Sequence, residues 1–181
     1  MIDKVTVMED LIKETILFAS GCISEQETPP KSNRSPLIDR IQKAFGLIGQ
    51  QYCVMFVLWC YMKTLERLKL QFPFIKTASS QTLYTECEKK GWTTTDLSKV
   101  LPGDIMIFRK YHKWAGHAAL VVDKGVNSVT TIEGNTSNSN YGSQSDGDGI
   151  WKRIRKVTEA EFKVDDWYIR GFIQVRKAIV I

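Results

Sequence analysis

Eleven consecutive residues, Tyr52 to Met62, are all apolar. A run of this length falls well short of the roughly 20 residues that a membrane-spanning helix needs. If the segment from Val54 to Lys69 is helical, apolar side chains lie on all sides of it as far as Met62, and the pattern is amphipathic after that residue. This pattern predicts a helix whose N-terminal half is buried in the protein core. The fold must therefore enclose this helix.

The segments before the apolar run also have helical patterns. Val7 to Ser20 carries apolar residues on one face, and Gly21 is a typical helix stop. Ser35 followed by a proline is a helix N-cap signal, which predicts a second helix over Pro36 to Phe45 with Gly46 at its exit. The polar stretch between these two helices indicates a loop.

The second half of the chain changes character. After a further helical segment around Thr82 to Lys90, a Pro-Gly turn in "LPGDIMIF" leads into alternating, strand-like sequence. Helices followed by strands favour an α+β fold with an antiparallel sheet. The predicted strands are Asp104 to Arg109, His117 to Asp123, Ser128 to Glu133, Gly149 to Arg155 and Ile169 to Arg176.

Length and composition are those of a globular protein with one domain. The chain has 181 residues, of which 43% are hydrophobic and 25% are charged, so we expect a single domain over residues 1–181 with its core at about 7–176. The four cysteines are too few for a disulfide framework in a chain this long, and they form no CxxC metal signature. The first residues lack a basic region that leads into a long apolar one, so we expect no signal peptide.

The formal net charge is +5, which suits an anionic partner without identifying it. Basic residues concentrate in "RKYHK" at 109–113 and "KRIRK" at 152–156. The second cluster alternates at strand period, which predicts that its charges lie on a solvent-exposed strand face. A nucleic-acid-binding protein would need aromatic residues interleaved with such charges, so we rank that class last and expect no nucleic acid partner.

Two cysteines lie in the apolar helix, and their positions in it differ. Cys53 lies in the first turn, where backbone N–H groups lack partners and the helix dipole favours an anion. Cys60 lies two turns further in, among apolar side chains. A buried structural role is the usual one for a free cysteine. If either cysteine is a nucleophile, we expect it to be Cys53, only partly buried at a cleft.

A cysteine nucleophile needs a base and a group that orients the base. Of the two histidines, His112 lies in a polar loop, whereas His117 opens the apolar strand "HAALVV". Glu133 and Asn135 end the next predicted strand, and they point to the same side if the strand continues between them. Either could accept the imidazole N–H, although a solvated strand end and a turn residue are the simpler interpretations of each alone.

Taken together, these segments resemble the CHAP domain family, which are cysteine- and histidine-dependent amidohydrolases or peptidases. The resemblance covers nearly the whole chain and is carried by motifs in the same order as in the family: "GQQYCVMFVLWC", "LPGDIMIF", "AGHAALVV", "TIEGNTS" and "DGDGIWKRIR". It implies a papain-like α+β fold, in which N-terminal helices and a buried nucleophile helix pack on an antiparallel β-sheet.

The resemblance also implies roles for individual residues. Cys53 corresponds to the nucleophile, His117 to the general base and acid, and Glu133 to the group that orients His117. Asn135 corresponds to a further polar residue of the active site. By analogy with the papain-like fold, the Cys53 backbone N–H and Gln51 are the expected oxyanion donors. Around the nucleophile, the sequence is Tyr-Cys-Val-Met, where many relatives have Trp-Cys-Ala-Ala. The larger side chains after the cysteine are expected to affect the width of the pocket more than the catalytic chemistry.

The implied substrate is peptidoglycan, cut as an N-acetylmuramoyl-L-alanine amidase or as a peptidoglycan endopeptidase. We expect no cofactor and no metal, because "SDGDGI" lacks the glutamate of a complete calcium loop and is interpreted as a turn. The protein would be made in the cytoplasm and act on the cell wall after release or export, either as a phage lysin or as an effector with an immunity or export partner. The alternative is a catalytically silent wall-binding module on the same fold.

Overall fold

The computed structural model describes residues 3–138, 146–157 and 167–181. In these residues most helices precede the strands along the chain. The helical elements are α1 (Lys4–Ser20), α2 (Pro36–Lys43), α3 (Cys53–Arg67), α4 (Ser80–Lys89), the 3-10 turn η1 (Leu97–Lys99) and α5 (Val175–Ala178).

The described strands form one antiparallel sheet with the spatial order β1-β6-β2-β3-β4-β5. The mixed α+β class with an antiparallel sheet is therefore confirmed, and the arrangement is compatible with a papain-like fold. The strands are β1 (Thr93–Thr94), β2 (Ile105–Lys110), β3 (Gly116–Lys124), β4 (Ser128–Thr136), β5 (Gly149–Lys156) and β6 (Trp167–Ile173).

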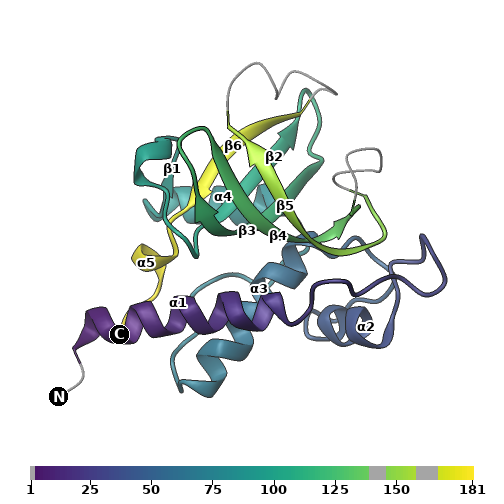
Figure 1. Cartoon of the computed structure of the whole chain (residues 1–181), viewed down its shortest axis with the longest axis horizontal. Coiled ribbons are helices and arrows are strands. Elements are labelled where there is room, and N and C mark those ends of the chain that lie inside the picture. The colour runs from purple at the N-terminus through teal and green to yellow at the C-terminus, as the bar shows by residue number, and fades with distance from the viewer. Residues whose placement is uncertain (1–2, 139–145, 158–166) are drawn as a thin grey trace.

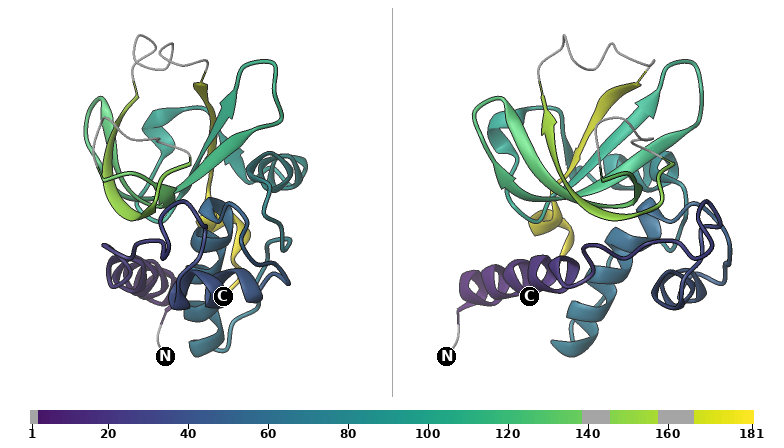
Figure 2. Two further views of the ribbon diagram at one scale, coloured as in Figure 1. Left: turned by 90° about the vertical axis from the view of Figure 1, so that its right-hand side faces the viewer. Right: turned by 45° about the vertical axis from the view of Figure 1, so that its right-hand side comes forward.

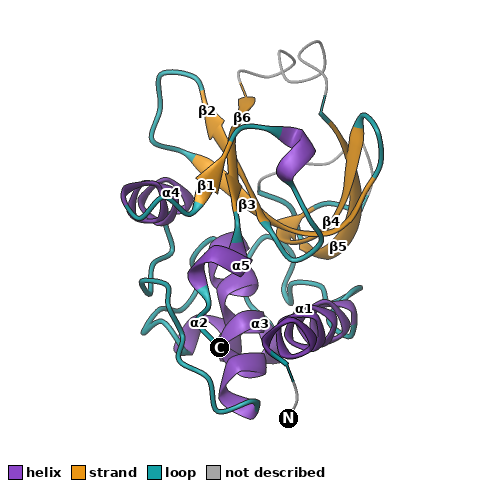
Figure 3. Cartoon of the chain, turned by 90° about the vertical axis from the view of Figure 1, so that its left-hand side faces the viewer, coloured by secondary structure: helices purple, strands orange, loops and turns teal. Residues whose placement is uncertain are grey.

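The sheet and the helices form two layers. The sheet lies above α1, α2 and α3 (Figure 1), and it is strongly curled (Figure 2). The helix α4 lies apart from the other helices, against β1, β2, β3 and β6 (Figure 3). The helix α3 contacts α1 and α2 on one side and β3 and β4 on the other, so it lies between the layers.

The apolar run of α3 explains this central position. Met55, Phe56, Val57 and Leu58 have no exposed surface although they point in different directions around the helix. Burying one such side chain contributes roughly 1.5–3 kcal/mol relative to leaving it in water. A helix with this sequence is therefore stable only when it is covered on all sides, as the apolar pattern predicts.

The helix boundaries follow from their capping residues. Ser35 Oγ accepts a hydrogen bond from the Ile38 N–H at 3.0 Å, which confirms the predicted N-cap of α2. The first helix begins earlier than predicted because the Asp3 carboxylate accepts from the Thr6 N–H at 2.9 Å and caps α1 at Lys4. The helix does end before Gly21, although that glycine has right-handed rather than left-handed dihedral angles.

Two strand predictions differ from the structure by three residues at one end, and the others by one residue. The last strand stops at Ile173 rather than at Arg176, because the chain turns into α5 where the Asp104 carboxylate accepts from the Val175 N–H at 3.1 Å. The strand predicted over Ser128 to Glu133, β4, continues to Thr136, so its end lies alongside α3. Within the described part of the chain, no helix is both long and apolar enough to span a bilayer.

Candidate active site

Cys53 is the first residue of α3, as its position in the apolar run predicts. The N-cap residue, Tyr52, makes no side-chain capping hydrogen bond, so the first turn keeps N–H groups that no capping side chain satisfies. Hydrogen bonds from the backbone of Val54 and Ala118 favour the thiolate of Cys53. The expectation of a partly exposed cysteine is wrong: Cys53 is only 5% exposed because α3 is pressed against the sheet.

His117 is the second residue of β3 and is buried. The residue before it must be glycine, because a Cβ at Gly116 would lie 2.1 Å from Gln81 Nε2 and 2.3 Å from Ser80 Oγ. The start of β3 is thus packed tightly against the first turn of α4. On the sheet, the His117 ring lies 5.8 Å from the ring of Phe108, its antiparallel partner in β2. These contacts fix the imidazole at the strand end.

Glu133 lies in β4 and is completely buried. Its Oε2 is 2.8 Å from His117 Nε2, so this ring nitrogen is committed to the carboxylate. The other ring nitrogen, Nδ1, is buried and has no hydrogen-bond partner among the described residues, so it is available to the thiol of Cys53, whose pKa the His117 side chain lowers. The structure therefore brings Cys53, His117 and Glu133 into one site, with a hydrogen bond between His117 and Glu133 and an electrostatic interaction between Cys53 and His117.

Two residues that the sequence does not identify hold the Glu133 carboxylate. Arg155 Nε donates to Oε1 at 2.7 Å, and an Arg155 terminal nitrogen donates to Oε2. Thr131 Oγ1 donates to Oε1 at 2.5 Å. The Arg155 guanidinium also lies 5.5 Å from the centre of the Phe108 ring. A bidentate arginine and a hydroxyl thus fix the carboxylate that contacts His117.

This arrangement corrects the prediction that the "KRIRK" charges all face solvent. Lys152 is exposed, but Arg153 is buried and Arg155 points inward to Glu133. The intervening Ile154 is 72% exposed. The strand period is as predicted, but the face that carries the arginines turns inward, because Arg155 pairs with the buried Glu133 carboxylate and Arg153 donates to the Ser137 and Asn138 carbonyls. The only signal in the sequence was the shared period of Arg153 and Arg155.

The electrostatics of the three residues are coupled. Burial opposes ionisation of Cys53, but the hydrogen bond and the charge of His117 outweigh it and lower the pKa of the thiol. Burial also works against the imidazolium, yet Cys53 and Glu133 raise the pKa of His117 to about 9. Burial of Glu133 is offset by Arg155 and His117, which hold the pKa of the carboxyl well below its usual range. Both shifts act in the same direction, toward a thiolate-imidazolium pair.

Comparison with known proteins agrees with this geometry. Residues 45–135 match the CHAP domain family, and the match spans half of the chain. The chain belongs to the CHAP domain family. Searches of curated proteins and of solved structures returned no match.

Membership in the CHAP family indicates a hydrolytic cysteine- and histidine-dependent amidohydrolase or peptidase, of the type that acts on peptidoglycan. The matched segment contains Cys53, His117, Glu133 and Asn135, and it ends before Arg155. The bidentate contact of Arg155 with Glu133 is therefore a feature of this chain that the family match does not include.

The two auxiliary residues of the CHAP resemblance have different environments. Asn135 is completely buried with a φ of +58°, at a register shift between β4 and β5. The regular alternation that would place it beside Glu133 is therefore interrupted. Its Nδ2 lies 3.4 Å from Asp146 Oδ1. Gln51 is exposed in the loop that leads into α3. Their roles in catalysis remain predictions.

The segment "SDGDGI" leads into β5, and its first residue, Ser145, lies outside the described residues. The Gly147 N–H donates to the Asn135 carbonyl at 2.9 Å, which ties this segment to the end of β4. Glu27 lies near the two aspartates, and burial raises the pKa of its carboxyl, with Asp146 and Asp148 adding to the shift. Among the described residues, no cluster of three or more histidine, cysteine, aspartate or glutamate side chains is arranged to hold a metal ion.

Proposed function

We propose that this protein hydrolyses an amide bond of peptidoglycan by a thiol mechanism, with Cys53 as the nucleophile, His117 as the proton carrier and Glu133 as the residue that orients His117. The observation that carries the proposal is the buried pair of His117 and Glu133, with 2.8 Å between Nε2 and Oε2, beside a thiol at the start of α3 whose pKa His117 lowers. These are the nucleophile, base and orienting group that such chemistry requires.

In the first half of the reaction, the Cys53 thiolate attacks the carbonyl carbon of the scissile amide. The new S–C bond moves an electron pair onto the carbonyl oxygen, which becomes an oxyanion. As the carbonyl re-forms, the C–N bond breaks and the imidazolium of His117 gives its proton to the leaving amine. The products of this half are a free amine and a thioester on Cys53.

In the second half, neutral His117 takes a proton from water while the water oxygen attacks the thioester carbon. The C–S bond breaks, the carboxylic acid product leaves, and the proton returns the site to the thiolate-imidazolium pair. Glu133 keeps the ring in one orientation through both halves, since its Oε2 engages Nε2 and leaves Nδ1 for the sulfur and the proton transfers.

The oxyanion would form at the start of α3. The Cys53 backbone N–H has no partner within the helix, and the positive end of the helix dipole lies at the same place. Gln51 is the second donor in this proposal, because its exposed side chain is two residues before the nucleophile. Donors of this kind stabilise the transition state more than the ground state.

Arg155 has a positioning role in the proposed mechanism. Ionised Glu133 is completely buried, and an unpaired carboxylate would be costly there. The bidentate contact with Arg155 compensates this charge and keeps the carboxylate available to the imidazolium. Without Arg155, protonation of Glu133 would compete with orientation of His117.

The proposed substrate follows from family membership and charge. Peptidoglycan carries carboxylates on its stem peptides, and a protein with a net charge of +5 is attracted to such a polymer. Cleavage between sugar and stem peptide would make the protein an amidase, and cleavage within the peptide an endopeptidase. Both outcomes use the same thiol chemistry.

Mass spectrometry of purified peptidoglycan after digestion tests this proposal. We expect new free amines and carboxylates in the products of the wild-type protein and none with Cys53→Ser. A free lactyl group on the glycan would identify an amidase, and a cut stem or cross-bridge an endopeptidase. If the wild-type protein binds peptidoglycan, produces no fragments and has no thiol that iodoacetamide titrates, it is the catalytically silent wall-binding module instead.

A further inference from the structure

We infer that the tip of the β2-β3 hairpin is a substrate-binding platform that holds the acidic peptidoglycan strand beside the active site. This inference rests on the proposed function and adds a binding site to it. We call the following residues the hairpin platform: Arg109, Lys110, Tyr111, Lys113 and Trp114, together with Tyr168 of β6.

The platform combines exposed aromatic rings with cations. Trp114 is 59% exposed and Tyr111 is 44% exposed, and both lie in the turn between β2 and β3. The Arg109 guanidinium lies 5.6 Å from the Trp114 ring centre, and the rings of Tyr111 and Tyr168 are 4.7 Å apart. Large rings at the surface of a protein are unremarkable when scattered singly, but a cluster of them indicates an interaction site.

The turn is ordered by its own hydrogen bonds. The Lys110 N–H donates to the Ala115 carbonyl at 2.9 Å, and the Lys113 N–H donates to the Lys110 carbonyl at 3.2 Å. Arg109 Nε also donates to the Lys113 carbonyl at 3.2 Å. The aromatic rings and cations are therefore presented in fixed positions before any ligand arrives, which reduces the entropy cost of binding.

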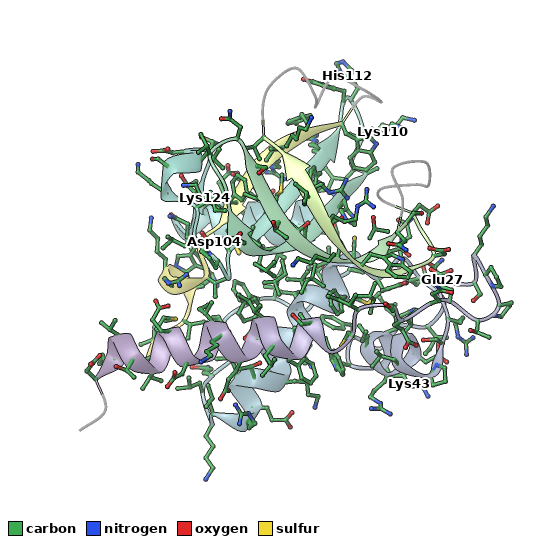
Figure 4. All side chains as sticks on the ribbon, in the orientation of Figure 1. Glu27, Lys43, Asp104, Lys110, His112 and Lys124 are labelled. Carbon is green, nitrogen blue, oxygen red and sulfur yellow. The ribbon has the colours of Figure 1, made fainter. Side chains whose placement is uncertain are left out.

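The platform is continuous with the strand that carries the candidate base. Trp114 precedes His117 by three residues, which corresponds to roughly 10 Å of extended chain. Arg109 alternates with Phe108 along β2, so it shares the sheet face of Ile105 and Ile107, which pack in the same core cluster as Cys53. His117 pairs with Phe108 and lies on the other face, so the platform adjoins His117 along the strand rather than across one face of the sheet. Lys110 and His112 are visible at the end of the sheet remote from α1 (Figure 4).

The charge of the platform selects an acidic ligand. Within the described part of the chain, no carboxylate forms an ion pair with Arg109, Lys110 or Lys113. Elsewhere on the described surface, several arginines and lysines do have such partners, for example Arg34 with Asp39. Three cations that have no ion-pair partner among the described residues lie together at this end of the hairpin, where they repel each other and gain from an anionic ligand.

A peptidoglycan strand matches both parts of this surface. The C–H faces of its pyranose rings pack on aromatic side chains, and the carboxylates of its stem peptides pair with lysine and arginine. A single-stranded nucleic acid also combines rings and anions, and an anionic membrane attracts the same residue types. We favour peptidoglycan because the platform adjoins the strand of His117, where the acyl group of that polymer must bind.

The test measures binding separately from hydrolysis. The parent protein carries Cys53→Ser, and its binding to purified peptidoglycan sacculi is measured by co-sedimentation. Adding Tyr111→Ala and Trp114→Ala should weaken binding at least tenfold, and adding Lys110→Glu and Lys113→Glu should weaken it similarly. The charge-matched control is Lys43→Glu with Lys152→Glu, two exposed lysines outside the platform, which should change binding less than threefold.

Thermal unfolding of each variant verifies that the hairpin changes leave the fold intact, and a single-stranded oligonucleotide and phosphatidylglycerol vesicles serve as competing ligands. Unchanged sacculus binding by both platform variants overturns the inference, whatever the hydrolysis assay gives. Platform-dependent binding to the oligonucleotide or vesicles without platform-dependent binding to sacculi overturns it as well. If the wild-type protein fails to cut peptidoglycan while the platform still binds it, the proposed function fails and the binding site stands.

Discussion

The first and third turns of α3 hold two cysteines that are equally inaccessible and chemically opposite. Cys53 is 5% exposed and Cys60 is fully buried, so solvent access does not separate them. Burial raises the pKa of Cys60 well above that of an ordinary thiol. In Cys53 the same cost of burial is overcome by His117 and by the backbone of Ala118 and Val54, which lower its pKa. Reactivity is therefore set by the polar groups at a helix start and not by exposure.

The largest effect on hydrolysis is expected from substitution of Cys53, in the first turn of α3. Cys53→Ser should lower peptidoglycan hydrolysis at least about a thousandfold, because an alcohol is far less readily ionised than a thiol. The fold should be retained, since the two side chains are nearly isosteric. Turnover on purified peptidoglycan and thermal unfolding measure the two properties. Hydrolysis at more than a tenth of the wild-type rate would remove Cys53 from the role of nucleophile.

The next largest effect is expected from substitution of His117 and Glu133, the groups that distinguish the surroundings of Cys53 from those of Cys60. His117→Ala should reduce turnover roughly a thousandfold, since it removes the proton carrier. Glu133→Gln should lose less activity, because the amide oxygen of glutamine can still accept the imidazole N–H. The comparison is made by steady-state kinetics on folded variants. Equal losses in the two variants would show that orientation by the charged carboxylate is as essential as the proton carrier.

The pH dependence of stability and activity should reflect the ionisation of His117 and of its partner Glu133. His117 has a pKa of about 9 in the folded protein against 6.5 ordinarily, so its ion pair contributes fully to stability below about 6.5, and the contribution is lost as the pH rises through about 9. Activity should fall over the same alkaline range. Glu133 behaves in the opposite way: Arg155 lowers its pKa, so its contribution is present above 4.5 and is lost only in acid.

Arg155→Gln should therefore shift the acid limit of activity to higher pH and leave the alkaline limit in place. At neutral pH we expect a loss of about tenfold, comparable to the loss of an oriented partner of a catalytic group. Arg155→Lys should restore part of the acid tolerance because it keeps the charge. Activity of Arg155→Gln that declines uniformly at every pH would mean that Arg155 supports only the fold.

A smaller effect on activity is expected from substitution of Cys60, in the third turn of α3. Cys60→Ser places a hydroxyl among apolar side chains and should cost roughly 1–3 kcal/mol of unfolding free energy unless the hydroxyl finds a partner. For a chain of this size this corresponds to a decrease in Tm of several degrees. Turnover should stay within about twofold of wild type. Loss of turnover with unchanged Tm would reverse the roles of the two cysteines.

The smallest effect is expected from metal removal. The thiol mechanism uses no metal ion, so EDTA should leave the hydrolysis rate unchanged. The assay is turnover before and after chelation, followed by addition of calcium. A strong loss that calcium restores would make the segment around Asp146 and Asp148 a metal site.

The helices and strands were predictable because each depends on local sequence. The Ser-Pro start of α2, the apolar period of α3 and the alternation in β3 are visible in the chain itself. The candidate nucleophile and base were found because a helix start and a strand start have distinct chemical settings. These features require no knowledge of which strands are neighbours.

The surroundings of Glu133 were not predictable in the same way. Arg155 follows Glu133 by 22 residues and meets it only through the register of β4 and β5. Sequence alternation does not reveal which strand face turns inward, so the charges of "KRIRK" are predicted to face solvent, whereas Arg153 is buried and Ile154 is 72% exposed. The burial of Cys53 likewise depends on how closely α3 packs against β3. Register and packing between layers are tertiary properties, and they determine the parts that sequence reasoning missed.

Peptide-mapped alkylation of the native protein tests the central claim most directly. Iodoacetamide is applied in substoichiometric steps at neutral pH, and at each step mass spectrometry locates the label while peptidoglycan hydrolysis is measured. We predict that label accumulates on Cys53 and not on Cys60, that hydrolysis falls in proportion to Cys53 labelling, and that His117→Ala slows this labelling at neutral pH. Loss of hydrolysis that follows labelling of Cys60, or full hydrolysis after complete labelling of Cys53, would contradict the account.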